Sequence, residues 1–214
     1  MSRPDLHALL LSHVPSHKIH LRKRVLSMLQ SNENGVFVRT SDGSTHRCDI
    51  LVGCDGAYSG VRQSLYSLMK KESDAFKNSE GGSESGGSIE EDWRASKLPL
   101  GPGNSYITIG DLISSTESDN ITKVMLEEKL YITWHHGRTG LMGDACHKML
   151  PNAGRGAVNA MLDAVILANS LYEVAKDASY PNIRSAFKEY YDERFPHAKA
   201  DLESSKRIAS TLSG

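Results

Sequence analysis

The residues best suited to chemistry lie between Gly140 and Leu171, in the stretch GLMGDACHKMLPNAGRGAVNAMLDAVILANSL. The pattern predicts a short apolar strand, a turn at Gly143-Asp144, a loop, and then a long amphipathic helix. Ligands of open α/β sheets bind outside the carboxyl ends of the strands, and Asp144 follows such an end. A carboxylate only accepts hydrogen bonds, so Asp144 suits a ribose-type hydroxyl.

The loop and the start of the helix complete this candidate site. Gly154 and Gly156 lack a Cβ, so the backbone can approach a flat ligand closely. The first turn of the helix offers free N–H groups and the positive end of the helix dipole, which favour a negatively charged partner. Together these parts predict a nucleotide or flavin site.

The order of these residues resembles the second flavin motif of FAD-dependent monooxygenases of the aromatic-hydroxylase type. The insertion Cys146-His147-Lys148 is similar to fungal members of that family. The positions that carry the resemblance are Gly143, Asp144, Ala145, Pro151, Gly154, Arg155, Gly156, Asn159, Asp163 and Ala164. The resemblance implies that Asp144 binds a hydroxyl in the ribityl or ribose region of FAD. It implies further cofactor-binding residues near the isoalloxazine: Pro151, Gly154, Gly156, Ala157, Val158 and Asn159.

A second motif precedes the first, in the sequence DILVGCDGAYSGVR from Asp49 to Arg62. It predicts an apolar strand, a turn at Asp55-Gly56 and a helix, and by itself it also fits a structural Asp with a salt-bridging Arg. It resembles the Asp-Gly motif of the same monooxygenases, which implies that Asp55, Gly56 and Arg62 serve the FAD pyrophosphate. The pattern of Arg3, Leu6 and Leu10 resembles a family segment whose Arg approaches the FAD.

The chain in order predicts a partial FAD-binding domain. We expect an α/β fold of the FAD/NAD(P)-binding, Rossmann-like type, with a small antiparallel meander and C-terminal helices. Residues 1–71 would form its first part, 72–104 a flexible Gly/Ser/Glu-rich linker, and 105–214 its second part. Helices are expected over 2–13, 61–69, 119–128 and 180–214, with Pro196 breaking or kinking the last one.

Composition restricts the class of protein. The 214 residues include 25 Lys and Arg against 26 Asp and Glu, without a basic stripe, so no nucleic-acid partner is expected. Three cysteines without a C-x-x-C pair indicate a reducing compartment, and neither a signal peptide nor a membrane span is predicted. We expect a cytoplasmic protein, with peripheral membrane association left open. No metal is expected, because adjacent His135 and His136 would point to opposite faces of a strand.

Two features of the family pattern are missing from the sequence. It has no strand followed by G-x-G-x-x-G and a helix, which is the usual first nucleotide-binding motif. The region between the two later motifs is short for a substrate-binding sheet. The chain is therefore expected to be a truncated member that self-associates through exposed sheet edges.

The resemblance implies an NAD(P)H-dependent monooxygenase that uses FAD, molecular oxygen and a small organic substrate. One oxygen atom would pass from a flavin hydroperoxide to the substrate, and the flavin would carry the chemistry, so no catalytic side chain is assigned. The alternative is a non-catalytic flavin-binding remnant or an interaction module. A phosphatase-like use of Gly143-Asp144 is disfavoured, because no D-x-D motif occurs.

Overall fold

The computed structural model describes residues 2–72, 108–117, 119, 128–150 and 154–212. The chain divides into two compact units, one made of Met1–Lys77 and Glu127–Gly214 and the other of Asn78–Leu126. In the second unit the described structure is helix α3 (Ile109–Ser115), which Thr108 and Asp111 cap reciprocally. The predicted linker over 72–104 and the predicted helix over 119–128 lie almost entirely outside the described residues. The candidate site lies in the first unit.

The first unit begins with helix α1 (Arg3–Ser12) and the short 3-10 helix η1 (Ser16–Lys18). The predicted start of α1 is confirmed, since the Asp5 amide donates to Ser2 Oγ and the Ser2 amide donates to Asp5 Oδ2 at 3.0 Å. No residue of α1 is buried.

An antiparallel meander follows, as the sequence predicts. Its strands β1 (Val25–Ser31), β2 (Gly35–Thr40) and β3 (Thr45–Cys48) lie in the order β1-β2-β3. The hairpin between β1 and β2 depends on Gly35, which has φ +83° and whose added Cβ would lie 2.5 Å from the Cys48 carbonyl oxygen. The inner face of the meander contributes Met28, Val36 and Val38 to the core.

A small mixed sheet brings the two sequence motifs together. Its strands are β4 (Leu51–Gly53), β7 (Thr139–Leu141) and β6 (His135–His136), in the order β4-β7-β6. Strands β4 and β7 are parallel, with Leu51 opposite Thr139 and Gly53 opposite Leu141. Their carboxyl ends therefore share one edge, so the turns that follow them are neighbours. Strands β5 (Lys129–Leu130) and β8 (His147–Lys148) form a separate antiparallel pair.

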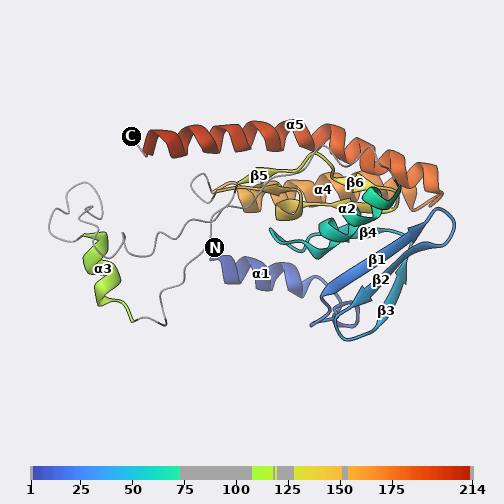
Figure 1. The fold of residues 1–214 in the computed structure, drawn as a ribbon, viewed down its shortest axis with the longest axis horizontal. Coiled ribbons are helices and arrows are strands. Elements are labelled where there is room, and N and C mark those ends of the chain that lie inside the picture. Colours follow the sequence, from blue (N-terminus) through green and yellow to red (C-terminus); the bar gives the residue numbers. More distant parts are fainter. Residues whose placement is uncertain (1, 73–107, 118, 120–127, 151–153, 213–214) are drawn as a thin grey trace. The chain divides into compact units, whose positions relative to one another are not determined.

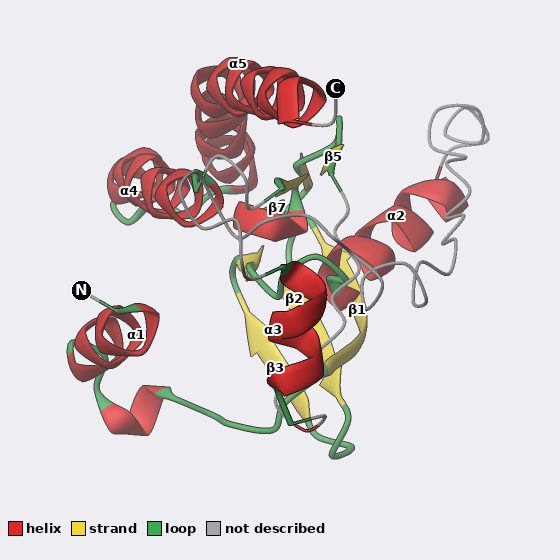
Figure 2. Cartoon of the chain, turned by 90° about the vertical axis from the view of Figure 1, so that its left-hand side faces the viewer, coloured by secondary structure: helices red, strands yellow, loops and turns green. Residues whose placement is uncertain are grey.

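Three helices complete the unit: α2 (Gly60–Glu72), α4 (Gly156–Val174) and α5 (Tyr180–Leu212). Figures 1 and 2 show α4 and α5 running side by side. Helix α5 packs tightly on β7, because an added Cβ on Gly140 would lie 2.3 Å from the Phe187 ring. Buried Trp134, Phe187 and Tyr190 form the aromatic part of this core.

Helix α5 agrees with one of the two alternatives predicted at Pro196. The sequence predicts a break or a kink there; one helix continues through the proline, and both views show that helix bent rather than interrupted. A proline inside a helix removes one backbone hydrogen bond, which is a usual cause of such a bend. Among the described residues, no helix combines the length and apolarity needed to cross a bilayer.

Candidate functional site

The turn after β7 presents the carboxylate that the sequence singles out. Gly143–Ala145 forms the 3-10 helix η4, and Gly143 adopts φ +60°. The turn lies against the second turn of α4, since an added Cβ on Gly143 would lie 3.2 Å from the Cβ of Ala160. Asp144 is exposed and has no hydrogen bond or ion pair to any residue that the structure describes. Its carboxylate is therefore available to a ligand.

The start of α4 is also open. Gly154 has φ +61°, and an added Cβ on Gly154 or Gly156 would meet no described atom within 4 Å. The residue that precedes the helix, Arg155, makes no side-chain hydrogen bond to the first turn. Within the described part of the chain, the amides of Gly156, Ala157 and Val158 have no acceptor. Three N–H groups at the positive end of a helix thus lie beside an open glycine surface.

These features meet the requirements of a flavin. A sugar or ribityl hydroxyl needs a hydrogen-bond acceptor such as Asp144, and a planar ring needs backbone without side chains, as at Gly154 and Gly156. A reduced flavin is anionic, and the amides at the start of α4 would stabilise its charge. The donor set and the open space therefore fit FAD.

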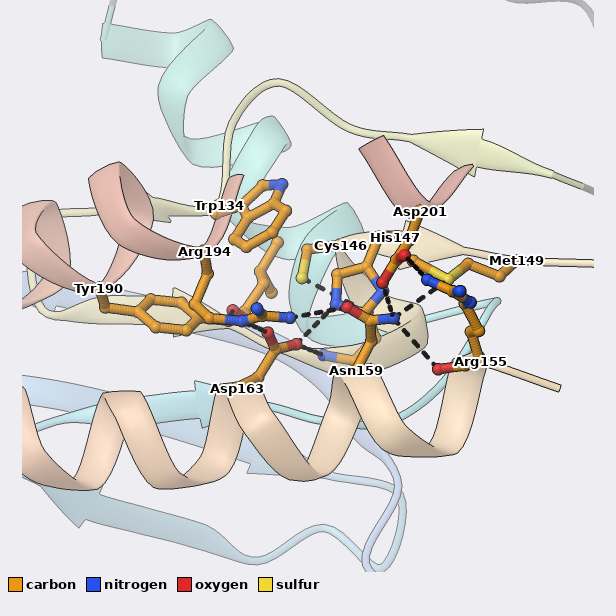
Figure 3. A network of polar contacts seen from close by, with 12 residues as sticks. Trp134, Cys146, His147, Met149, Arg155, Asn159, Asp163, Tyr190, Arg194 and Asp201 are labelled. Carbon is orange, nitrogen blue, oxygen red and sulfur yellow. Dashed lines mark hydrogen bonds and ion pairs between the residues drawn. The ribbon is translucent and has the colours of Figure 1, made fainter. Parts of the chain in front are cut away.

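Behind this open surface lies a buried polar network around Asp163, shown in Figure 3. One carboxylate oxygen of Asp163 accepts from the Gly143 amide at 2.9 Å and from His147 Nε2 at 2.6 Å. The other accepts from Arg194 Nε at 2.8 Å, while Arg194 Nη2 donates to Asn159 Oδ1 at 2.7 Å. All four side chains are buried. Burial alone would raise the pKa of Asp163, but the hydrogen bonds from His147, from Arg194 and from the Gly143 amide hold it below its ordinary value.

Asn159 extends the network toward the start of α4. Its Nδ2 group donates to the Arg155 carbonyl at 3.1 Å and to Asp201 Oδ2 at 3.0 Å. The Arg155 side chain forms an ion pair with the same Asp201. The sequence predicts Asn159 as a cofactor-binding residue. That role stays a prediction, and the described contacts of the side chain are with the protein.

Three potential metal ligands meet inside the same network. Atoms of Cys146, His147 and Asp163 lie within 4.8 Å of one another. However, the Asp163 carboxylate already accepts hydrogen bonds from Gly143 and His147 and pairs with the Arg194 cation, which would repel a metal ion. Burial raises the pKa of the Cys146 thiol well above its ordinary value, which also disfavours the thiolate that a metal requires. The cluster is better described as a hydrogen-bonded network.

The residues of the Asp-Gly motif lie at the same edge of the sheet. The hydrogen bonds described for Asp55 are with other residues of the motif itself. Asp55 accepts from the Ser59 hydroxyl and from the Val61 amide at 3.1 Å, so it holds the start of α2. Gly56 has φ +83°. Their roles at the FAD pyrophosphate stay predictions.

Arg62 is buried and joins the two motifs. Its Nη1 donates to the Ala145 carbonyl and its Nη2 to the Ala57 carbonyl, each at 2.8 Å, and the guanidinium lies 4.1 Å from the centre of the Tyr131 ring. The arginine thus ties the turn after β4 to the turn after β7. A pyrophosphate role for Arg62, like the others in this motif, remains a prediction.

For two predicted site residues, the structure describes no contact with this surface. Arg3 lies exposed in the first turn of α1 and has no hydrogen bond or ion pair within the described residues. Pro151 lies outside the described residues. Both assignments stay predictions.

Sequence reasoning missed His147 and Arg194, and it noted Asp163 only as part of a motif. A signal was present in each helix. Asp163 interrupts the apolar run AMLDAVIL, and a charge on an apolar helix face requires a buried partner. Arg194 lies on the aromatic face of α5, one turn after Tyr190.

Comparison with known sequences finds similarity to an FAD-binding domain and to FAD-dependent monooxygenases. A family described as the FAD binding domain matches residues 107–205. FAD-dependent monooxygenase ptmM of Penicillium ochrochloron is 36% identical over 104 residues, which cover 47% of this chain and 24% of that protein. FAD-dependent monooxygenase paxM of Penicillium paxilli is 27% identical over 255 aligned residues, covering 88% of this chain and 53% of that protein. The chain thus spans about a quarter to a half of the length of these relatives.

Solved structures agree with the fold. Klebsiella pneumoniae HpxO complexed with FAD and uric acid superposes with a TM-score of 0.68 and 18% identity, over 97% of this chain and 62% of that one. A salicylate hydroxylase substrate complex superposes with a TM-score of 0.64 and 19% identity, over 97% of this chain and 65% of that one. The predicted fold, part of an FAD-binding domain with a small antiparallel meander and C-terminal helices, is confirmed. Residues 107–205 thus match the FAD binding domain, and the chain is similar to FAD-dependent monooxygenases over part of their length.

Proposed function

We propose that this chain forms the isoalloxazine side of the FAD site in an NAD(P)H-dependent monooxygenase. The observation that carries the proposal is the surface made by Asp144, the glycines at 154 and 156 and the first amides of α4, which have no acceptor among the described residues. When bound, FAD would accept a hydride from NADPH or NADH and reduce molecular oxygen, so that one oxygen atom enters a small organic substrate and the other leaves as water. A cytoplasmic location is part of the proposal and agrees with three free cysteines.

The chain's own groups would bind and orient the cofactor. Asp144 would accept a hydrogen bond from a hydroxyl of the ribityl or ribose region, and the backbone from Gly154 to Val158 would lie against the ring. The amides and dipole of α4 would stabilise negative charge on the reduced ring by about 1 kcal/mol. Asp55, Gly56 and Arg62 would lie on the pyrophosphate side, with Arg62 fixing the Ala145 carbonyl.

Flavin binding tests the proposal directly. The purified, desalted chain should show the visible absorption of bound FAD after reconstitution, followed by NADPH or NADH oxidation that depends on a substrate. A chain that takes up no FAD would contradict the proposal. Retention of FAD without any NAD(P)H oxidation would instead favour the alternative of a non-catalytic flavin-binding module.

The Asp144→Ala variant tests the assigned acceptor. A hydrogen bond to a charged group contributes about 1.5–3 kcal/mol, so the FAD dissociation constant should rise about tenfold or more. The melting temperature of the apo chain should hardly change, because Asp144 is exposed and unpaired among the described residues. Asp49→Ala is the matched control, since it removes the same charge at the opposite end of β4. Equal losses in binding and stability would count against the assignment.

A further inference from the structure

The buried carboxylate of Asp163 is the point where three separate elements meet. It accepts from the Gly143 amide in η4 and from the ring of His147 in β8, and it pairs with Arg194 from α5. Asp163 itself belongs to α4 and is 0% exposed. A ligand on the open surface cannot touch it without displacing these partners, so any role of Asp163 in binding must act through them.

The partner that matters most for the site is the Gly143 amide. Gly143 has φ +60°, a conformation that glycine can leave easily because it has no Cβ to restrict it. The position of Asp144 depends on this turn, since the two residues are adjacent in η4. An acceptor for the Gly143 N–H therefore removes conformational freedom from the residue that presents the Asp144 carboxylate.

The protonation pattern of the network supports a fixed acceptor. The hydrogen bonds of His147, Arg194 and Gly143 outweigh the burial of Asp163 and lower its pKa, so the group is ionised and both oxygens accept. His147 must then carry its hydrogen on Nε2, while its buried Nδ1 has no partner among the described residues. Trp134 packs against the imidazole with ring centres 5.4 Å apart and limits its rotation.

We propose that Asp163, oriented by His147 and Arg194, is a positioning residue that fixes the Gly143-Asp144 turn in the conformation that binds flavin. The proposal rests on the proposed function for its ligand, but the fixed turn can be measured without any ligand. The buried Asp163 carboxylate would then preorganise the site without touching the cofactor itself.

Amide hydrogen exchange of the apo chain tests the fixed turn. In Asp163→Asn, the single remaining carbonyl oxygen cannot serve both Gly143 and Arg194, so exchange at the Gly143 amide should accelerate at least about tenfold. The control is Val174→Ala, which removes buried apolar contact at the far end of α4. A purely structural role for Asp163 would accelerate exchange throughout the chain by one common factor, as the control does. Acceleration at Gly143 no greater than at Val36 and Val38 would overturn the proposal.

A pair of variants at His147 keeps the test decisive if Asp163→Asn does not fold. His147→Gln places an amide N–H near the position of Nε2 and should preserve both exchange protection at Gly143 and FAD affinity. His147→Leu removes the donor without leaving a charge unpaired, and it should accelerate Gly143 exchange beyond the common factor. Identical behaviour of the two variants would overturn the role of His147.

Titration with FAD separates this inference from the proposed function. If the wild-type chain binds FAD, Asp163→Asn or His147→Leu should raise the FAD dissociation constant severalfold. Val174→Ala should leave this constant unchanged when its melting temperature is lowered by the same amount. Unchanged affinity in these variants would overturn the inference. If the wild-type chain binds no FAD, the proposed function fails, and the exchange data alone decide whether Asp163 fixes the turn.

Discussion

Arg62 supplies a connection that neither sequence motif contains by itself. Its guanidinium donates to the carbonyls of Ala57 and Ala145, which follow β4 and β7, and it stacks over Tyr131. Arginine suits this position because its planar fork serves several acceptors at once. The contact explains why an arginine opens the helix after the Asp-Gly turn even without reference to a phosphate.

Replacing Arg62 tests this connection. Arg62→Lys keeps the charge but cannot reach both carbonyls, so the free energy of unfolding should fall by about 1–3 kcal/mol. Chemical denaturation by urea, followed by tryptophan fluorescence of buried Trp134, would measure the loss. Arg39→Lys on the exposed side of β2 is the control and should change little. Comparable losses in the two variants would argue against the bridge.

Asp163 predicts a specific dependence of stability on acid. Its folded pKa lies below the ordinary value of 3.8, so its contribution is fully present above that value and is lost as pH falls through the folded pKa. The difference in unfolding free energy between wild type and Asp163→Asn should be constant from neutral pH to about pH 5 and shrink below about pH 4. Urea titrations at a series of pH values would measure it. A difference that does not shrink in acid would contradict a lowered pKa.

At the scale of elements, a substitution in the first turn of α4 should change stability and FAD binding in opposite directions. Gly156 lies in a helix, and an added Cβ would meet no described atom within 4 Å. Gly156→Ala should therefore stabilise the apo chain slightly, by up to about 1 kcal/mol, because alanine favours helix. The same methyl group would occupy the space proposed for the isoalloxazine and should weaken FAD binding.

Thermal unfolding measures the stability of Gly156→Ala, and FAD titration measures its affinity. Higher stability together with weaker FAD binding would identify the start of α4 as the ligand surface. Ala168→Gly on the exposed face of α4 offers the reverse control, since it should lower stability and leave FAD affinity unchanged. Improved or unchanged FAD binding in Gly156→Ala would place the ring elsewhere.

At the scale of the whole molecule, an apolar face of α4 is exposed among the described residues. It consists of side chains spaced to lie together on the helix, each at least 40% exposed: Val158, Met161, Leu162 and Val165. The sequence predicts self-association through sheet edges, and this prediction remains untested. The structure adds this face of α4 as a further candidate surface for such contacts.

Sedimentation velocity at increasing concentrations would measure this association. Val165→Lys should shift the chain toward the monomer, because it places a charge within the apolar face. Leu29→Lys on the exposed side of β1 is the matched control. A shift caused by Leu29→Lys alone would favour association through the sheet.

Much of this architecture could be predicted because its signals are local. Asn34-Gly35 specifies a hairpin, Ser2 and Asp5 specify a helix start, and Gly143-Asp144 marks the end of a strand. These features depend on backbone conformation and capping, which the residues themselves impose.

The interior of the site could not be predicted in the same way. The Asp163–Arg194 pair and the Arg62–Ala145 contact join residues 31 and 83 positions apart, so they exist only once the helices have packed.

The parallel pairing of β4 with β7 has a consequence for how the length of the chain can vary. The two strands are joined by the whole middle of the sequence, so their pairing closes a long loop. The entropy of closing a loop grows only with the logarithm of its length, and each doubling costs about 0.6 kcal/mol. Insertions in that middle segment would therefore change stability little, while the late closure of the loop would slow assembly of the edge where both motifs meet. The fold thus allows the segment between β4 and β7 to change in length at small thermodynamic cost.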